Sequence, residues 1–262
     1  MTMNSNQTSA QARHAYYKRL VWLASIWSWP VCLIGVGITF ILIGGFVPPP
    51  LPSSSAQEIA TFFTAEPTHI RFGAMGFLYF SGITILFYSV ISEEIKKIEG
   101  QPSLLARIQL GSAVILVTIF QLIGLAWLLA SYRTDTSPDI IRMLNDYCWF
   151  IWSMFIPTYI IQYVCVAIAS FMDVRENPTW PRWAGWMNLW IAFGGAGGIA
   201  AVFFKNGPFA WNGIIGFWIP VIIFATGNCV NTWLMHRRYT HDQVQSATSQ
   251  PSSLSTGSLV SR

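Results

Sequence analysis

The chain has 262 residues, of which 53% are hydrophobic and only 10% are charged. Soluble proteins carry charge on about a quarter of their residues, so this composition excludes an ordinary soluble domain and predicts a fold in lipid. The net charge of +4 does not indicate nucleic-acid binding, because the basic residues stand singly or in pairs at the ends of apolar runs, where they set membrane orientation.

Six apolar segments are long enough to cross a bilayer as helices, which takes about 20 residues at about 1.5 Å each. Their apolar runs are continuous and do not alternate, so they predict helices and not a β-barrel. The segments are residues 21–47, 72–91, 108–131, 147–172, 183–204 and 209–235. The predicted fold class is therefore all-α, a polytopic membrane bundle of six transmembrane helices.

Lysine and arginine are distributed unequally between the two sides of this topology. One side has eleven: Arg13, Lys18, Arg19, Lys96, Lys97, Arg107, Arg175, Arg182, Arg237, Arg238 and Arg262. The other side has four: Arg71, Arg133, Arg142 and Lys205. The positive-inside rule places both termini in the cytoplasm. We predict a cytoplasmic N-terminal segment over residues 1–20, a transmembrane domain over 21–236 and a disordered cytoplasmic tail over 237–262. The tail is rich in Ser, Gln and Thr, and the N-terminal segment has the same polar character to about Ala15.

Two connections on the predicted outer side contain helix-start signals. Ser55 and Glu58 have the spacing of a capping box, which predicts a short interfacial helix. Pro138 follows Ser137 and predicts a helix that leads into the fourth span, where Arg142 and Asp146 are spaced i, i+4 and within reach of each other.

A ring of polar and aromatic residues is predicted at one depth on the outer side, at the starts of the second, fourth and sixth spans. It consists of His69, Arg71, Asn145, Asp146, Trp149, Trp211 and Asn212. If these spans are neighbours, Arg71 and Asp146 could pair where the dielectric falls. We interpret the ring as a candidate ligand-binding site; the alternative is a set of interfacial caps and a structural ion pair.

Metal and cofactor sites are not expected. The four histidines lie at segment ends or in the tails, so they cannot clamp a haem in the core or form a zinc site. The four cysteines lie inside apolar stretches and are interpreted as buried hydrophobes. No ionisable residue lies near the middle of a predicted span, which disfavours a proton-driven pump.

Polar and helix-breaking residues do occur inside the spans. Amides and hydroxyls there form hydrogen bonds between helices or line a cavity, and they are Thr84, Gln121, Gln162, Asn188, Thr226, Asn228 and Asn231. Pro30, Pro157 and Pro220 predict kinks. Gly194 and Gly198 have the spacing that lets two helices approach closely, so we assign them to helix packing.

Several local signatures resemble those of a group of uncharacterised bacterial multi-pass membrane proteins. They are Asn145-Asp146 followed by Trp149, Pro181-Arg182-Trp183 with Asn188 and Trp190, and the stretch from Gly207 to Gly213 with Pro220. The resemblance covers most of the chain from Ser55 to the end of the sixth span. It implies a bacterial inner-membrane location and brings no activity.

The leading hypothesis is a non-enzymatic membrane protein that binds or helps to move a hydrophobic or amphipathic small molecule. One alternative is an accessory or assembly subunit, which would dock another membrane protein or a second copy through the glycines of the fifth span. The other alternative is a lipid-modifying enzyme, for which Asp146, His69 and Glu66 are the suitably placed acids and bases.

Overall fold

The computed structural model describes residues 5–133 and 135–248, and every regular element in these ranges is a helix. Six helical segments are long and apolar enough to span a membrane: Ser9–Ile43, Pro67–Glu99, Leu104–Ala130, Pro138–Met172, Arg182–Val202 and Ile214–Gln245. The predicted all-α bundle with six spans is therefore confirmed, and the chain is a multi-pass membrane protein.

The described ranges contain nine α-helices and three shorter helices of other types, and α2 lies between the first and second spans. In chain order they are α1 (Ser5–Val36), the π-helix η1 (Gly37–Ile43), α2 (Ala56–Ala65), α3 (Pro67–Gly82), α4 (Thr84–Glu99), α5 (Leu104–Ala130), α6 (Pro138–Met154), α7 (Ile156–Met172), α8 (Arg182–Gly194), the 3₁₀-helix η2 (Gly195–Val202), the π-helix η3 (Ile214–Trp218) and α9 (Ile219–Thr248).

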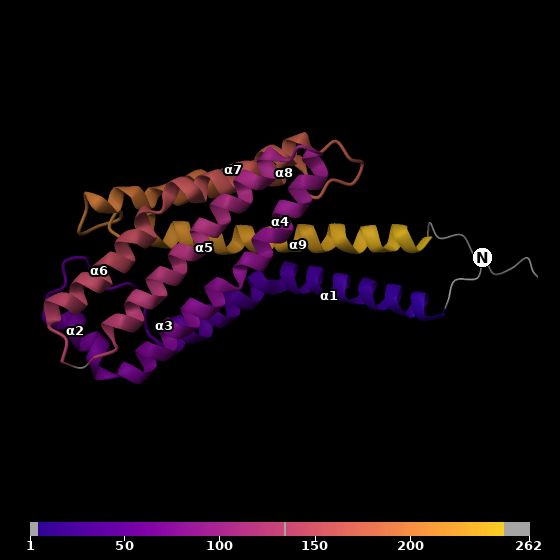
Figure 1. Ribbon diagram of the computed structural model, residues 1–262. Helices are drawn as coiled ribbons and strands as arrows, with labels where there is room; N and C mark the ends of the chain where they lie inside the picture. The colour runs from indigo at the N-terminus through magenta and orange to yellow at the C-terminus, as the bar shows by residue number, and fades with distance from the viewer. Residues whose placement is uncertain (1–4, 134, 249–262) are drawn as a thin grey trace, which may run out of the picture.

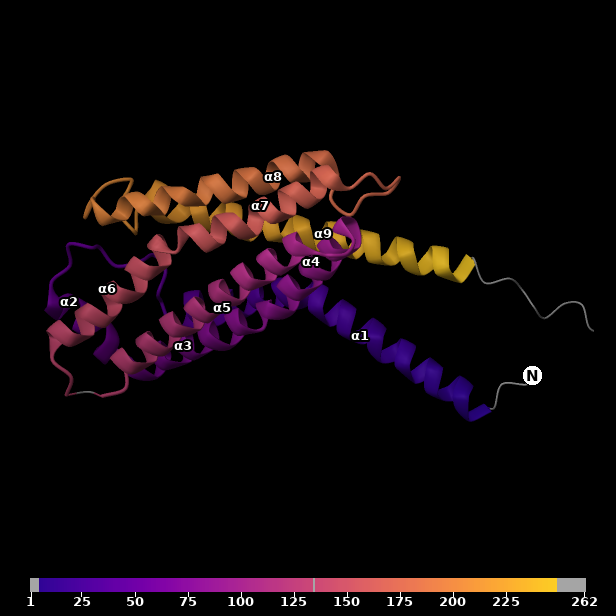
Figure 2. The ribbon, with the colours of Figure 1, turned by 45° about the horizontal axis from the view of Figure 1, so that its top comes forward.

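The bundle has two distinct ends, which Figure 1 shows at left and right. The first, called the α2 end, gathers α2 and the starts of α3 and α6. The second, called the terminal end, is where α1 begins and α9 ends. Within the bundle α5 packs against α3, α4, α6 and α7, while α8 packs against α7 and α9. Figure 2 shows that α1 and α9 both extend beyond the other helices at the terminal end.

An aromatic cluster forms the core near the α2 end. Phe40 stacks on Phe46 with ring centroids 4.5 Å apart, and both rings contact Trp127. Trp149 packs against Trp127 at 5.1 Å. Such rings bury a large apolar area and prefer tilted or edge contacts, so this cluster holds η1, α5 and α6 together.

The short α2 helix begins with the predicted capping box. Ser55 Oγ accepts a hydrogen bond from the Glu58 amide at 3.3 Å, and the Ser55 amide donates to Glu58 Oε2 at 2.7 Å. The two side chains satisfy backbone donors that the first helical turn leaves without partners.

Two of the three predicted proline positions coincide with helix distortions. The fourth span breaks at Phe155 between α6 and α7, just before Pro157, and the sixth span begins as the π-helix η3 just before Pro220. Pro30 lies inside α1, which continues through it. The fifth span changes from α8 to a 3₁₀-helix at its glycine-rich stretch.

Both chain ends are more helical than the sequence predicted. α1 begins at Ser5 and α9 continues to Thr248, so helix replaces part of the predicted polar head and of the predicted 237–262 tail. The two helices contact each other where Trp22 stacks on Tyr239 with ring centroids 6.2 Å apart. Within α9, Arg238 pairs with Asp242 at 3.0 Å. Residues 1–4 and 249–262 lie outside the described ranges.

Candidate functional site

A charged groove lies at the α2 end between α6 and the end of the fifth span. Its volume is about 680 Å³. The side chains of α6 form one wall, η2 and the residues after it form the other, and Pro52 and Trp211 border it. The lining residues are Pro52, Asp139, Arg142, Met143, Asp146, Tyr147, Phe150, Ala201, Val202, Phe204, Lys205 and Trp211.

The α6 wall follows from helical spacing. Asp139, Arg142, Asp146 and Phe150 are separated by three or four residues and therefore lie on one face. Arg142 pairs with Asp139 at 3.1 Å and not with Asp146, so the predicted i, i+4 pair is replaced by an i, i+3 pair. Asp146 accepts a long hydrogen bond from Asn145 Nδ2 at 3.5 Å.

Positive charge faces Asp146 from both walls of the groove. Arg142 on α6 and Lys205 after η2 both lie close enough to attract its carboxylate electrostatically. The groove thus combines two carboxylates, one of which already pairs with Arg142, with two cations beside aromatic and aliphatic surface. Such a site can hold a molecule that carries charge at one end and is apolar at the other.

Two long-range hydrogen bonds fix the loops at the rim. Trp211 Nε1 donates to the Pro50 carbonyl at 2.9 Å, and Ser53 Oγ donates to Asn206 Oδ1 at 3.2 Å. They tie the proline-rich loop after η1 to the loop before η3. Asn212 follows Trp211 and is half-buried, outside the set of residues that line the groove.

Arg71 and His69 lie elsewhere at the α2 end. Arg71 donates from Nε and Nη2 to the Ser131 carbonyl at 3.0 and 2.7 Å, and from Nη2 to the Tyr132 carbonyl at 3.2 Å. His69 Nδ1 contacts Glu66 Oε2 at 2.5 Å on the surface. The predicted pair of Arg71 with Asp146 is therefore wrong. Carbonyls at the end of a helix have no hydrogen-bond donor within that helix, so the Arg71 guanidinium donates to those that follow α5.

Asn145 and Trp149 belong to the core. Both are buried, and Trp149 Nε1 donates to Asn145 Oδ1 at 3.1 Å. Of the predicted ring, the structure brings Asp146 and Trp211 into one groove and leaves His69, Arg71, Asn145, Trp149 and Asn212 outside its lining. The depth of a residue in the membrane can be predicted from its place in a span, but depth does not determine which way each side chain points.

The two assigned packing glycines contact other helices of the same chain. A Cβ atom on Gly198 would lie 2.7 Å from the Ser153 carbonyl oxygen of α6, and one on Gly194 would lie 2.5 Å from Ile223 Cδ1 of α9. A side chain at Gly198 would force η2 and α6 apart, because the atom it meets is backbone.

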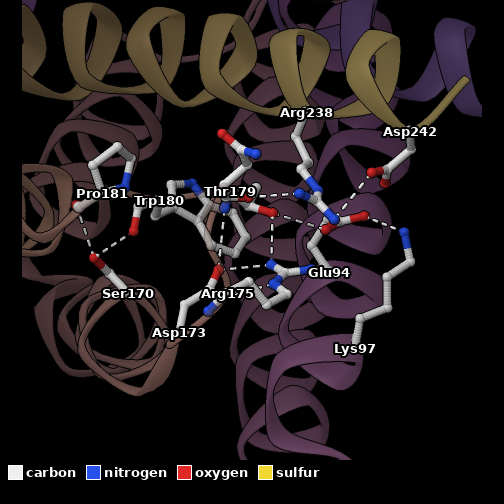
Figure 3. Close-up of polar contacts among 11 residues, drawn as sticks. Glu94, Lys97, Ser170, Asp173, Arg175, Thr179, Trp180, Pro181, Arg238 and Asp242 are labelled. Atoms are coloured by element: carbon white, nitrogen blue, oxygen red, sulfur yellow. Dashed lines mark hydrogen bonds and ion pairs between the residues drawn. The ribbon is translucent and has the colours of Figure 1, made fainter. Parts of the chain in front are cut away.

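A second polar cluster, called the terminal network, lies at the opposite end and was missed by sequence reasoning (Figure 3). Asp173 accepts from Arg175 Nε at 2.7 Å, Arg175 Nη2 at 2.6 Å and the Thr179 amide at 3.1 Å. Thr179 Oγ1 donates to Glu94 Oε2 at 3.0 Å, and Glu94 also pairs with Lys97. The network joins α4 to the loop between α7 and α8.

The terminal network is largely buried despite its charge. The Asp173 side chain is 1% exposed and the Glu94 side chain is 6% exposed. Burial alone would raise the pKa of Asp173, but the hydrogen bonds from Arg175 and Thr179 outweigh burial and lower that pKa. The sequence signal was an Asp and an Arg two residues apart, directly after the fourth apolar segment.

The fold and the groove together define a multi-pass helical membrane protein with a charged, apolar-walled recess at one end of the bundle. No protein-family model, no curated protein and no solved structure matches the chain.

Proposed function

We propose that the protein binds, and helps to move, an amphipathic small molecule whose charged head occupies the groove at the α2 end. The observation that carries the proposal is the joint presence of Asp146, Arg142 and Lys205 above an apolar wall in one recess. The distribution of basic residues and the resemblance of the sequence support a bacterial inner membrane, with the groove on the external side.

The size and composition of the groove favour a small molecule with charges of both signs. Small-molecule sites typically have volumes of about 300–1,000 Å³, and the 680 Å³ groove falls in that range. Tyr147, Phe150 and Phe204 offer aromatic surface to an apolar part. A zwitterionic head would place its cation near Asp146 and its anion near Lys205, so that each charge has a partner.

The two alternatives have less support. Gly194 and Gly198, the docking face of the accessory-subunit hypothesis, already contact Ile223 and Ser153 of the same chain. For a lipid-modifying enzyme, two of the three acids and bases that the sequence suggested lie elsewhere, because His69 contacts Glu66 outside the lining of the groove.

The proposal is tested by equilibrium binding of a fluorescent zwitterionic amphiphile, a dodecylphosphocholine analogue, to the full chain in lipid nanodiscs. Lys205→Gln and Asp146→Asn each remove one charge from the groove. We expect Lys205→Gln to weaken binding about tenfold, because a charge-assisted hydrogen bond to the phosphate contributes about 1.5–3 kcal/mol and partial solvent exposure reduces that value. Asp146→Asn should also weaken binding, because the carboxylate attracts the trimethylammonium group by charge alone.

The matched control is Lys96→Gln, which removes an exposed lysine at the terminal end, where it pairs with Glu93 at 3.8 Å. We expect its affinity to equal that of the wild type. Equal affinities for the wild type, both groove variants and the control would contradict the proposed function.

A further inference from the structure

A small cavity lies deeper in the bundle, next to the groove along the same two walls. Its volume is about 70 Å³, which is room for a few non-hydrogen atoms. Phe120, Trp152, Phe155, Tyr159 and Phe224 supply aromatic walls. The cavity is bounded by the break between α6 and α7, the 3₁₀-helix η2 and the π-helix η3, so three distorted span segments meet there.

One side-chain hydroxyl in the cavity lining has no partner. Ser153 is 4% exposed, and its Oγ makes no hydrogen bond. A buried hydroxyl without a partner costs about 1–3 kcal/mol, so its presence in an apolar lining needs a reason. Several other buried serines do have partners: Ser81 Oγ, for example, donates to the Leu78 carbonyl at 3.2 Å.

Two prolines add hydrogen-bond acceptors at the same place. Pro157 and Pro220 have no N–H to give to the carbonyls four residues earlier, which belong to Ser153 and Gly216. Both carbonyl oxygens lie beside Gly198, since a Cβ there would be 2.7 Å from the first and 3.5 Å from the second. The lining therefore offers one hydroxyl and two carbonyls.

The cavity and the groove follow one seam between α6 and η2. On α6, Asp146 and Phe150 line the groove, and Ser153 lines the cavity one turn further. On η2, Gly198 lines the cavity and Ala201 lines the groove. Positions three apart are eclipsed on a 3₁₀-helix, so these residues face α6 together. Seven residues of α-helix separate Asp146 from Ser153 by about 10 Å along the axis.

We infer that this cavity is an intramembrane subsite that takes the hydrogen-bond donor of the ligand, a hydroxyl or amine on an apolar body, with Ser153 and the two carbonyls as acceptors. The inference deepens the proposed function and rests on it, because it gives the donor-bearing end of the same ligand a place about 10 Å from its charged head. Discontinuous membrane helices bind ligands and ions in this way, through backbone carbonyls that would accept hydrogen bonds within a regular helix.

The test is photolabelling of the full chain in nanodiscs with a decanol that carries an alkyl diazirine, followed by mass spectrometry of the labelled peptides. The matched probe is its methyl ether, which has the same body and no donor. We expect the alcohol to label residues 152–159 and 195–198 in a saturable manner that excess decanol competes. The ether should label these residues about fivefold less than the alcohol, because one hydrogen bond typically changes an affinity by about that factor.

Ser153→Ala should reduce alcohol labelling to the level of the ether, whereas Ser81→Ala should leave it unchanged. Without a probe, Ser153→Ala should melt at or above the temperature of the wild type, because it removes a buried group that lacks a partner. Unsaturable labelling, or equal labelling by alcohol and ether in the wild type and in Ser153→Ala, would overturn the subsite.

Failure of the subsite and failure of the proposed function give different results. The alcohol is uncharged, so its labelling of the cavity should survive Lys205→Gln, which weakens binding of the zwitterion in the groove. Saturable zwitterion binding that depends on Lys205, with no donor-dependent labelling of the cavity, would refute the subsite alone. Donor-dependent labelling without charge-dependent zwitterion binding would support the cavity and refute the proposed groove function.

Discussion

Asp173→Ala is expected to lower the free energy of unfolding by about 3 kcal/mol at neutral pH. The buried carboxylate accepts two hydrogen bonds from the Arg175 guanidinium, at 2.7 and 2.6 Å, and two more from the amides of Arg175 and Thr179, at 3.2 and 3.1 Å. Removing one member of a buried pair typically costs about 3–5 kcal/mol. The lower limit applies because the Arg175 side chain is 28% exposed and water can partly replace its partner.

The loss should depend on pH in a defined direction. The native state lowers the pKa of Asp173 below its ordinary value of 3.8, so this carboxylate stabilises the fold fully at pH values above that range. The stabilisation is lost as the pH falls below 3.8 and through the lower pKa of the folded protein. The difference between wild type and Asp173→Ala should therefore be constant from about pH 6 to 8 and shrink below about pH 4.

The assay is unfolding of the purified protein in mixed micelles by increasing dodecyl sulfate, followed by circular dichroism. A double-mutant cycle with Arg175→Met separates the pair from the other contacts of each residue. Glu93→Gln is the control, because it removes an exposed pair and should cost less than about 0.5 kcal/mol. A cost below about 1 kcal/mol for Asp173→Ala, or additive effects in the cycle, would show that the pair of Asp173 and Arg175 does not stabilise the fold.

Two further substitutions separate stability from binding. Arg71→Met should lower the free energy of unfolding by about 1–3 kcal/mol, because the Ser131 and Tyr132 carbonyls lose a charged donor. The affinity for the zwitterion should stay unchanged. Weakened binding with unchanged stability would contradict the capping role of Arg71. The side-chain nitrogen of Asn231 donates to Asn188 Oδ1 at 3.0 Å. Asn188→Ala removes this acceptor and should lower the free energy of unfolding by about 1 kcal/mol. In the same unfolding assay, the double variant with Asn231→Ala should cost less than the sum of the single variants, and strict additivity would argue against the pair.

The sequence predicted the spans because their signal is long and depends only on composition. Twenty apolar residues identify a membrane helix without knowledge of its neighbours. The capping box at Ser55 was equally accessible, since its donors and acceptors lie within four residues of the chain. Pro157 and Pro220 coincide with breaks, but α1 continues through Pro30, so a proline predicts a missing hydrogen bond and not the resulting geometry.

The site was predictable only in part, because its contacts join residues far apart in the chain. Their positions at the starts of predicted spans placed Asp146 and Trp211 at the same end of the bundle, and the structure shows both in the lining of the groove. Arg71 was expected in the same site, but it donates to backbone carbonyls that become available only where α5 ends. The terminal network joins Glu94 to Thr179 across 85 positions, a separation that no local pattern encodes.

The most direct test of the central claim is gentle extraction of the wild type into native lipid particles, with mass spectrometry of every molecule that co-purifies. Lys205→Gln and the control Lys96→Gln would be extracted in parallel. We expect one stoichiometric amphipathic molecule, retained by the wild type and the control and depleted in Lys205→Gln. A stoichiometric protein partner with no such molecule, or equal retention by all three, would contradict this claim.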